Sequence, residues 1–197
     1  MEQSPAGRTP RIIPLDDQFE LRPARAQHAE PWYSVADRNR ARLREWLPWA
    51  GRSFTLEDIR NFLSDSEREN AQGIALTLGI WKGETFCGGI GLHKIDSRSR
   101  SASIGYWLDE QCGGTGLMTR ACSALVTEAF RHYGLHRVEL RCAVGNEKSC
   151  AIARRLGFSE EGLLREAEWL NTHWADLRVF SMLEQYWTPN KNSVPRS

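Results

Sequence analysis

Hydrophobic and polar residues alternate along several short segments of the chain, and this period of two predicts β-strands. Every second residue from Ile74 to Ile80 is a large aliphatic side chain. A Lys-Gly step follows at positions 82–83, so we expect an antiparallel hairpin that continues through residues 84–95. Further strands are predicted for residues 19–24, 101–108, 136–144, 158–168 and 175–186.

Apolar residues recur at helical spacing in other segments. After Thr55, the residues Leu56, Ile59, Phe62 and Leu63 share one helical face. The Thr55 side chain can cap such a helix, and the two acidic residues that follow Leu56 suit its first turn. Helices are also predicted for residues 27–45, 115–132 and 146–157.

The order of the predicted elements indicates the fold. It runs strand, helices, three-strand meander, helix, strand, helix, strand, strand, with no internal repeat or change of composition. This order favours an α/β fold of the α+β type, with a mixed, mostly antiparallel sheet and helices on both faces. We expect one domain over residues 15–187, with flexible tails at residues 1–14 and 188–197.

Composition narrows the class of protein. The chain has 197 residues, of which 41% are hydrophobic, and 26 basic residues nearly balance 25 acidic ones. A net charge of +1 gives nucleic-acid binding little electrostatic support. No apolar run is long enough for a membrane span, and no signal sequence is visible, so a cytoplasmic protein is expected. The five cysteines include no CxxC pair, which argues against a zinc site or a disulfide framework; no metal is expected.

Three glycines at positions 113, 114 and 116 directly precede a predicted helix. Bare backbone ahead of a helix N-terminus favours a phosphate ligand. A Walker-type loop would need Lys and then Ser or Thr, where this chain has Leu117 and Met118. A dinucleotide fingerprint also lacks its spacing and its acidic partner. Two interpretations remain, a metal-free pyrophosphate site and a glycine-rich turn without a ligand.

The segment IGYWLDEQCGGTGLMTRA, residues 104–121, resembles the acetyl-CoA motif of the GNAT family of N-acetyltransferases. The motif fits in two registers, one starting at Gln111 and one at Gly113. We prefer the second, because it leaves the family's spacing between Leu108 and Gly116 and ends on Thr119, as in the RimJ/RimL branch. Gly113 then stands where the family has Arg or Gln, so one side-chain contact to phosphate is missing.

Three other segments resemble the same branch, and the resemblance extends over residues 19–187. They are residues 39–50, 146–158 and 167–183. The resemblance implies two splayed central parallel strands that hold acetyl-CoA, and a homodimer. The residues it assigns to the coenzyme are Tyr106, Trp107, Leu108, Gly113, Gly114, Thr115, Gly116, Leu117, Met118, Thr119, Asn146 and Ser149.

In the family, main-chain groups of the strand ending at Leu108 bind the pantetheine arm. A bulge frees one N–H for the thioester carbonyl there, and Gly105 beside Tyr106 is compatible with such a bulge. Asn146 contacts the coenzyme by resemblance, and it can also act as a helix N-cap. Both roles remain open.

The resemblance also implies the catalytic residues. Glu168 matches the proposed base of the RimL group, and Glu166, two residues away, would face the same side of a strand and is the alternative. The tyrosine acid of many relatives is absent, because its position is Ala153. Ser149 matches a serine of the RimL group that can donate a hydrogen bond or relay a proton; a local helix bond is its other interpretation.

Several other side chains have two interpretations. Cys142 could carry an acetyl group, but a buried small hydrophobic residue is the better expectation. Arg154 and Arg155 could reach phosphates or could face solvent. Five tryptophans could line an acceptor groove or pack in the core, namely Trp46, Trp49, Trp107, Trp169 and Trp174.

The expected acceptor follows from the resemblance and from acid–base chemistry. A peptide α-amine has a pKa near ~7.7–8.0, whereas that of lysine is near ~10.4, so far more α-amine is neutral at pH 7. The leading hypothesis is direct acetyl transfer from acetyl-CoA to the N-terminal amine of a protein or peptide. The alternatives are acetylation of a small-molecule amine and a non-catalytic acyl-CoA-binding module.

Overall fold

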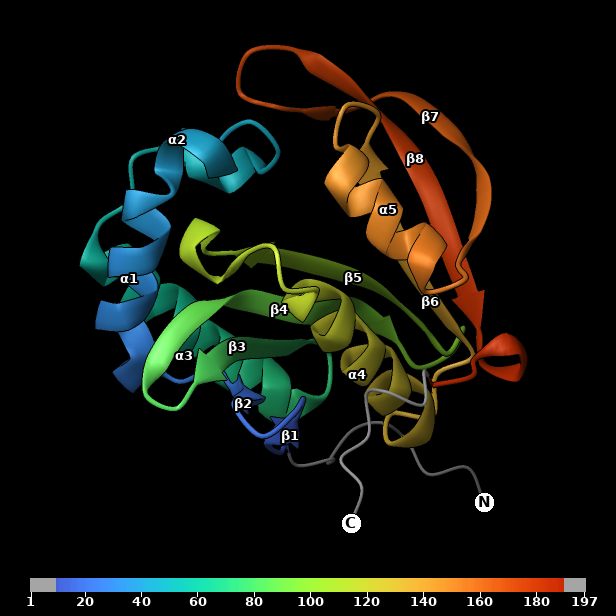
Figure 1. Ribbon diagram of the computed structural model, residues 1–197, viewed down its shortest axis with the longest axis horizontal. Coiled ribbons are helices and arrows are strands. Elements are labelled where there is room, and N and C mark those ends of the chain that lie inside the picture. The colour runs from blue at the N-terminus through green and yellow to red at the C-terminus, as the bar shows by residue number, and fades with distance from the viewer. Residues whose placement is uncertain (1–9, 190–197) are drawn as a thin grey trace.

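An eight-stranded mixed sheet crosses the computed structural model, which describes residues 10–189 (Figure 1). The strand order is β1-β2-β3-β4-β5-β6-β8-β7, and of these neighbours only β5 and β6 run parallel within the described residues. The strands are β1 (Ile13–Pro14), β2 (Phe19–Pro23), β3 (Leu76–Lys82), β4 (Thr85–Asp96), β5 (Ser101–Leu108), β6 (Arg137–Ala143), β7 (Ser159–Trp169) and β8 (Trp174–Leu183).

Helices cover both faces of the sheet, as predicted (Figure 1). The apolar face of α4 packs on one side of the central strands, together with part of α5, and α1 and α3 pack on the other side. The helices are α1 (Ala29–Arg38), α2 (Arg40–Leu43), α3 (Leu56–Gln72), α4 (Leu117–Arg131) and α5 (Glu147–Arg155), with 3₁₀ turns at residues 26–28, 48–51, 110–112 and 184–186.

Local signals identified most elements correctly. The Lys-Gly step joins β3 to β4 with Lys82 opposite Thr85. Thr55 begins α3 in a capping box with Asp58, whose side chain accepts the Thr55 N–H at 2.7 Å. At the N-terminus, residues 13–14, which were expected to be part of a tail, pair with β2. Residues 1–9 and 190–197 of the predicted tails lie outside the described residues.

The predicted helix over residues 27–45 is divided into α1 and α2 at Asn39. The buried Asn39 side chain donates to the Val35 carbonyl at 2.8 Å and so competes with the backbone for that acceptor. Its side-chain oxygen meanwhile accepts the Glu110 N–H at 3.1 Å. The break therefore comes from a long-range contact that helical periodicity does not reveal.

The two parallel strands separate along their length. Pairing between β5 and β6 runs from Ser101–Arg137 to Ile104–Leu140, although β5 continues to Leu108 and β6 continues to Ala143. β6 remains paired with β8 over its whole length. The side of β5 that faces β6 is consequently open beyond Ile104, which confirms the predicted splay.

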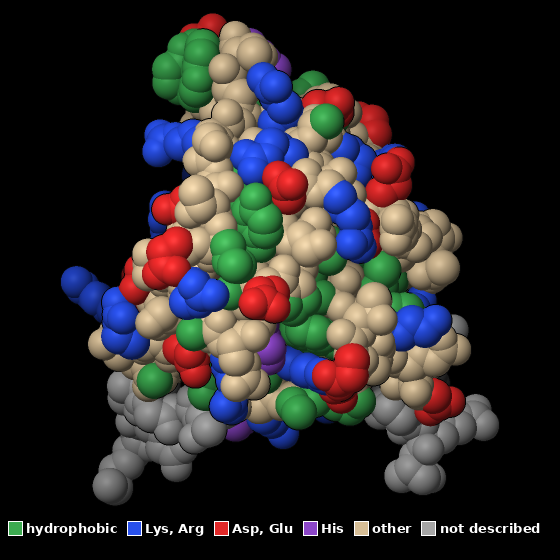
Figure 2. Space-filling model, turned by 90° about the vertical axis from the view of Figure 1, so that its left-hand side faces the viewer, with side chains coloured by type: hydrophobic (Ala, Val, Ile, Leu, Met, Phe, Trp, Pro, Cys, Tyr) green, Lys and Arg blue, Asp and Glu red, His purple; other side chains and the backbone are tan. Residues whose placement is uncertain are grey.

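Among residues 10–189, no helix has the length and apolar character that crossing a bilayer requires. Basic and acidic side chains are interspersed over the face that carries α1 (Figure 2). The part of the chain that the structure describes also contains no cluster of three His, Cys, Asp or Glu side chains that could hold a metal ion.

Candidate active site

A groove of about 1880 Å³ lies where β5 and β6 separate. It is lined by the end of β5, the glycine loop, the start of α4, the end of β6, the first turns of α5 and part of β7. Every residue that the resemblance assigns to the coenzyme lines this groove except Thr115, and so does the predicted base Glu168. The fold thus brings together side chains that are more than 60 positions apart in the sequence, from Tyr106 to Glu168.

The glycine loop forms an open cradle at one end of this groove. Gly114 and Gly116 have φ angles of 82° and 71°, a region that other residues rarely adopt. Gly116 is the N-cap of α4, where no side chain caps the first-turn N–H groups. A Cβ atom added at Gly114 would meet no atom within 4 Å. Free amides beside open space at a helix N-terminus fit a pyrophosphate.

Two arginines add positive charge to the cradle. Arg155, from α5, donates to the Thr119 hydroxyl at 2.9 Å, and Arg120 donates to the Thr115 carbonyl at 2.8 Å. Both line the groove. Arg120 also forms an ion pair with Asp16 at 3.2 Å. Arg154 does not line the groove and forms ion pairs with glutamates on α5 and β7 at 3.5 and 3.6 Å. Arg155 is therefore the better phosphate ligand of the two, and Arg120 is a candidate that the sequence patterns missed.

The end of β5 directs backbone groups into the groove. The Asp109 N–H donates to the Cys87 carbonyl of β4 at 2.7 Å. Because backbone groups alternate in direction along an antiparallel ladder, the N–H groups of Tyr106 and Leu108 point away from β4, toward the diverged β6. These two amides are suited to a carbonyl oxygen that develops negative charge.

The bulge expected at Gly105 is not present. The β4–β5 register is continuous from Gly88–Leu108 to His93–Ser103, and its irregularity lies farther along, between His93 and Asp96. The bulge expectation was wrong because divergence from β6, rather than an extra residue, leaves this edge of β5 unpaired.

A buried polar network fixes the end of β5 against α1 and α2. The Asp109 carboxylate is 2% exposed and accepts from the Arg38 guanidinium and, at 2.8 Å, from the Asn39 amide. The Arg42 guanidinium donates to the Asn39 side-chain oxygen at 2.9 Å and to the Leu108 carbonyl. Arg38, Asn39 and Arg42 therefore position the strand end that carries the candidate oxyanion donors. The sequence did not reveal this role.

We expect Asp109→Asn to lower the free energy of unfolding by about 2 kcal/mol at pH 7, since hydrogen bonds to a buried charge are lost. Burial raises the pKa of Asp109, but the bonds from Arg38 and Asn39 outweigh it and hold that pKa below its usual value. This stabilisation is complete above the unfolded-state pKa of ~3.9 and is lost as pH falls through the lower folded-state pKa. Urea unfolding should show that the free energies of unfolding of the parent protein and the variant differ by a constant amount above pH ~5 and by less in acid. A difference that does not change with pH would contradict the assignment.

Asn146 and Ser149 both lie in the first turn of α5. The Asn146 side chain accepts the Ser149 N–H at 3.2 Å, so the N-cap role is filled. The Ser149 hydroxyl lies 2.9 Å from the hydroxyl of Tyr106 rather than bonding locally. Burial raises the pKa of Tyr106, which keeps its phenol protonated. A phenol from β5 is thus present in the groove, although the expected tyrosine position is Ala153.

Glu168 lies in the groove and Glu166 does not. The half-buried Glu168 has a raised pKa because burial disfavours its charge, with Arg141 opposing the shift. Glu166 has a φ of 47° and lies in a bulge of β7. On either side of this bulge, Leu164 pairs with Leu177 of β8 and Glu168 pairs with Ala175. The expectation that the two glutamates face the same side was wrong, because this bulge interrupts the alternation of side chains.

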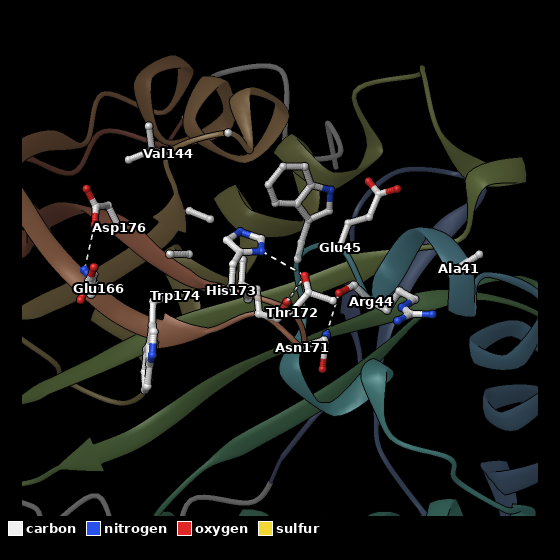
Figure 3. A pocket seen from close by; sticks show the side chains of 15 residues that line it. Ala41, Arg44, Glu45, Val144, Glu166, Asn171, Thr172, His173, Trp174 and Asp176 are labelled. Carbon is white, nitrogen blue, oxygen red and sulfur yellow. Dashed lines mark hydrogen bonds between the residues drawn. The ribbon is translucent and has the colours of Figure 1, made fainter.

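Glu166 instead lines a second hollow of about 780 Å³ (Figure 3). Its backbone N–H donates to the Asp176 carboxylate at 2.8 Å, and Asn171 ties the β7–β8 turn to the Arg44 carbonyl at 2.7 Å. Four residues line both this hollow and the groove, namely Glu45, Trp46, Ala143 and Gly145. The second hollow therefore adjoins the groove near its β6 end.

The tryptophans have different environments. Trp46 lines both hollows, whereas Trp107 is 9% exposed and its ring packs against Trp32 and Phe86. Trp169 and Trp174 are 47% and 57% exposed, with ring centroids 5.4 Å apart, where β7 meets β8. Trp46 is thus the one of these four whose side-chain position fits the wall of an acceptor groove.

Comparisons with known proteins agree with this geometry. The sequence profile of the acetyltransferase (GNAT) domain matches residues 18–159. The chain is 34% identical to a putative ribosomal N-acetyltransferase of Bacillus subtilis (strain 168), over 90% of this chain and 97% of that protein. It is 30% identical to the ribosomal-protein-serine acetyltransferase of Escherichia coli (strain K12), over 87% of this chain and 96% of that protein.

Solved structures show the same fold. A RimL ribosomal L7/L12 α-N-protein acetyltransferase in complex with coenzyme A superposes with a TM-score of 0.85 at 30% identity, covering 88% of this chain and 98% of that one. The microcin C7 self-immunity acetyltransferase MccE, in complex with acetyl-CoA and AMP, gives a TM-score of 0.83 at 30% identity, covering 90% and 98%.

Proposed function

The chain belongs to the GNAT family of acetyl-CoA-dependent N-acetyltransferases, and we propose that its acceptor is the N-terminal α-amine of a protein or peptide. The observation that carries the proposal is a half-buried carboxylate, Glu168, in the groove where β5 and β6 separate. The relatives named as ribosomal-protein acetyltransferases support this class of acceptor. A cytoplasmic location and a homodimer stay predictions.

Coenzyme binding is the first task of the groove. The amides from Gly114 to Thr119 would hold the pyrophosphate, and Arg155 and Arg120 would add charge. The N–H groups of Tyr106 and Leu108 would then donate to the thioester carbonyl oxygen, where charge develops during attack. Acetyl-CoA supplies the activated acyl group.

Proton transfer requires a base for the amine and a donor for the departing thiolate. Glu168 would accept the proton of the attacking amine, directly or through one water. Burial raises the pKa of Glu168, which improves this carboxylate as a base. Ser149 would donate to the thiolate, with Tyr106 donating in turn to Ser149. The protonated phenol would orient the serine hydroxyl as a hydrogen-bond donor to the sulfur.

We expect Ser149→Ala to lower kcat about tenfold, because the leaving thiolate loses one hydrogen bond of about 1.5 kcal/mol. The KM for acetyl-CoA should change less than kcat, since the cradle remains intact. Ser103→Ala is the matched control, because Ser103 also lines the groove but lies where β5 is still paired with β6. Equal losses in both variants, measured by thiol release, would exclude a specific role for Ser149.

The acceptor is tested by thiol release from acetyl-CoA against three classes of amine. These are peptides with free N-termini, lysine peptides with blocked N-termini, and polyamines. We expect the free N-terminal peptides to have the highest kcat/KM at pH 7. Fast turnover of polyamines without turnover of peptides would overturn the acceptor assignment, and no thiol release with any amine would point to a binding module.

A further inference from the structure

Two buried cysteines lie in contact at the floor of the groove, and the mechanism uses neither of them. Cys142, at the end of β6, lines the groove and is 4% exposed. Cys150, in α5, is fully buried. Their sulfur atoms are 3.1 Å apart. A disulfide bond measures ~2.05 Å, so a shift of about 1 Å would join the two sulfurs.

The two thiols differ in their access to solvent. Both thiols belong to the main core cluster, but Cys142 also lines the groove, where a reagent can reach it, and Cys150 does not. This is the arrangement of an attacking thiol with a resolving thiol behind it. Burial raises the pKa of Cys142 to about 12. Few thiolates are then present at neutral pH, and we expect oxidation over hours rather than seconds.

We propose that Cys142 and Cys150 form a redox-sensitive dithiol, which small-molecule disulfides oxidise to an intramolecular disulfide at the floor of the groove. The Cys142 thiolate attacks one sulfur of the reagent, the reagent's S–S bond breaks, and one small thiol leaves. The Cys150 thiolate then attacks the Cys142 sulfur and expels the second small thiol. Two protein thiols are oxidised, one reagent disulfide is reduced, and both protons pass to the departing thiolates.

Oxidation would affect the first turn of α5. Cys150 directly follows Ser149, and its N–H donates to the Asn146 carbonyl at 3.0 Å. Drawing Cys150 toward β6 moves this turn and strains the 2.9 Å contact between Ser149 and Tyr106. The same turn lines the groove. We therefore expect the oxidised protein to bind acetyl-CoA about tenfold more weakly, a loss of about 1.4 kcal/mol.

The test is incubation of the folded, reduced protein with glutathione disulfide, followed by intact-mass measurement and peptide mapping. We expect the loss of two hydrogens, a Cys142–Cys150 link in the mapped peptides and reversal by dithiothreitol. Saturating acetyl-CoA, which has no free thiol, should slow the reaction by occupying the groove above Cys142. Calorimetry then compares acetyl-CoA binding by the oxidised and reduced forms.

Variants locate the chemistry. Cys150→Ser should stop at a mixed disulfide on Cys142, and Cys142→Ser should form no link to Cys150. Cys112→Ser is the matched control, because Cys112 is the half-buried thiol beside the glycine loop, and the Cys142–Cys150 link should still form. A link between Cys87 and Cys112 in place of the proposed one, or only mixed disulfides in the parent protein, would overturn the proposal.

Discussion

The Glu168→Gln variant is expected to lose about 100-fold in kcat at pH 7, within the usual range for removal of a general base. The amide keeps the size of the side chain but cannot accept the proton of the amine. Its residual rate should rise with pH toward ~8, because more of the α-amine acceptor is then neutral without help. The rate for the parent protein should rise less steeply over the same interval.

The two glutamates provide an internal comparison. Glu166→Gln should retain activity within about twofold, because Glu166 lies in the second hollow beyond the bulge in β7. Glu168→Gln should not lower the melting temperature, since burial disfavours the charged carboxylate that the substitution removes. Full activity of Glu168→Gln, or an equal loss in both variants, would refute the assignment of the base.

The Gly114→Val variant is expected to bind coenzyme A about 100-fold more weakly. The added side chain would occupy open space in the cradle, where a Cβ now meets no atom within 4 Å. Losing two charge-assisted hydrogen bonds of about 1.5 kcal/mol each accounts for a change of this size. Isothermal titration calorimetry with coenzyme A measures it directly.

Gly83→Val is the control for backbone strain. Gly83 has a φ of 53°, also has open space around its Cα, and lies in the β3–β4 turn, outside the groove lining. A β-branched residue with positive φ costs about 1–2 kcal/mol at either site, so both variants should melt at lower temperatures. Only Gly114→Val should lose affinity; unchanged affinity would show that the cradle does not hold the phosphates.

Local patterns in the sequence predicted much of the fold and the composition of the groove. Alternation, a capping threonine and the Lys-Gly step are short-range signals, and each specified its element. The glycines before α4 identified the cradle for the same reason, because a left-handed conformation at a helix start demands glycine. The parallel β5–β6 pair and its splay followed from the family resemblance rather than from periodicity.

Features that depend on contacts between distant segments were missed. The role of Asn39 at the α1–α2 break depends on Asp109 and Glu110, about 70 residues away. The contact of Tyr106 with Ser149 joins β5 to α5. The bulge that separates Glu166 from Glu168 arises from the register of β7 against β8. Simple alternation along a strand contains no signal for any of these three.

A crystal structure with bound coenzyme A is the most direct test of the central claim, that the cradle and the splayed strands hold the thioester beside Glu168. We expect the pyrophosphate on the amides from Gly114 to Thr119 and the thiol end between β5 and β6, near the N–H groups of Tyr106 and Leu108. A coenzyme bound elsewhere, with the cradle empty, would contradict it.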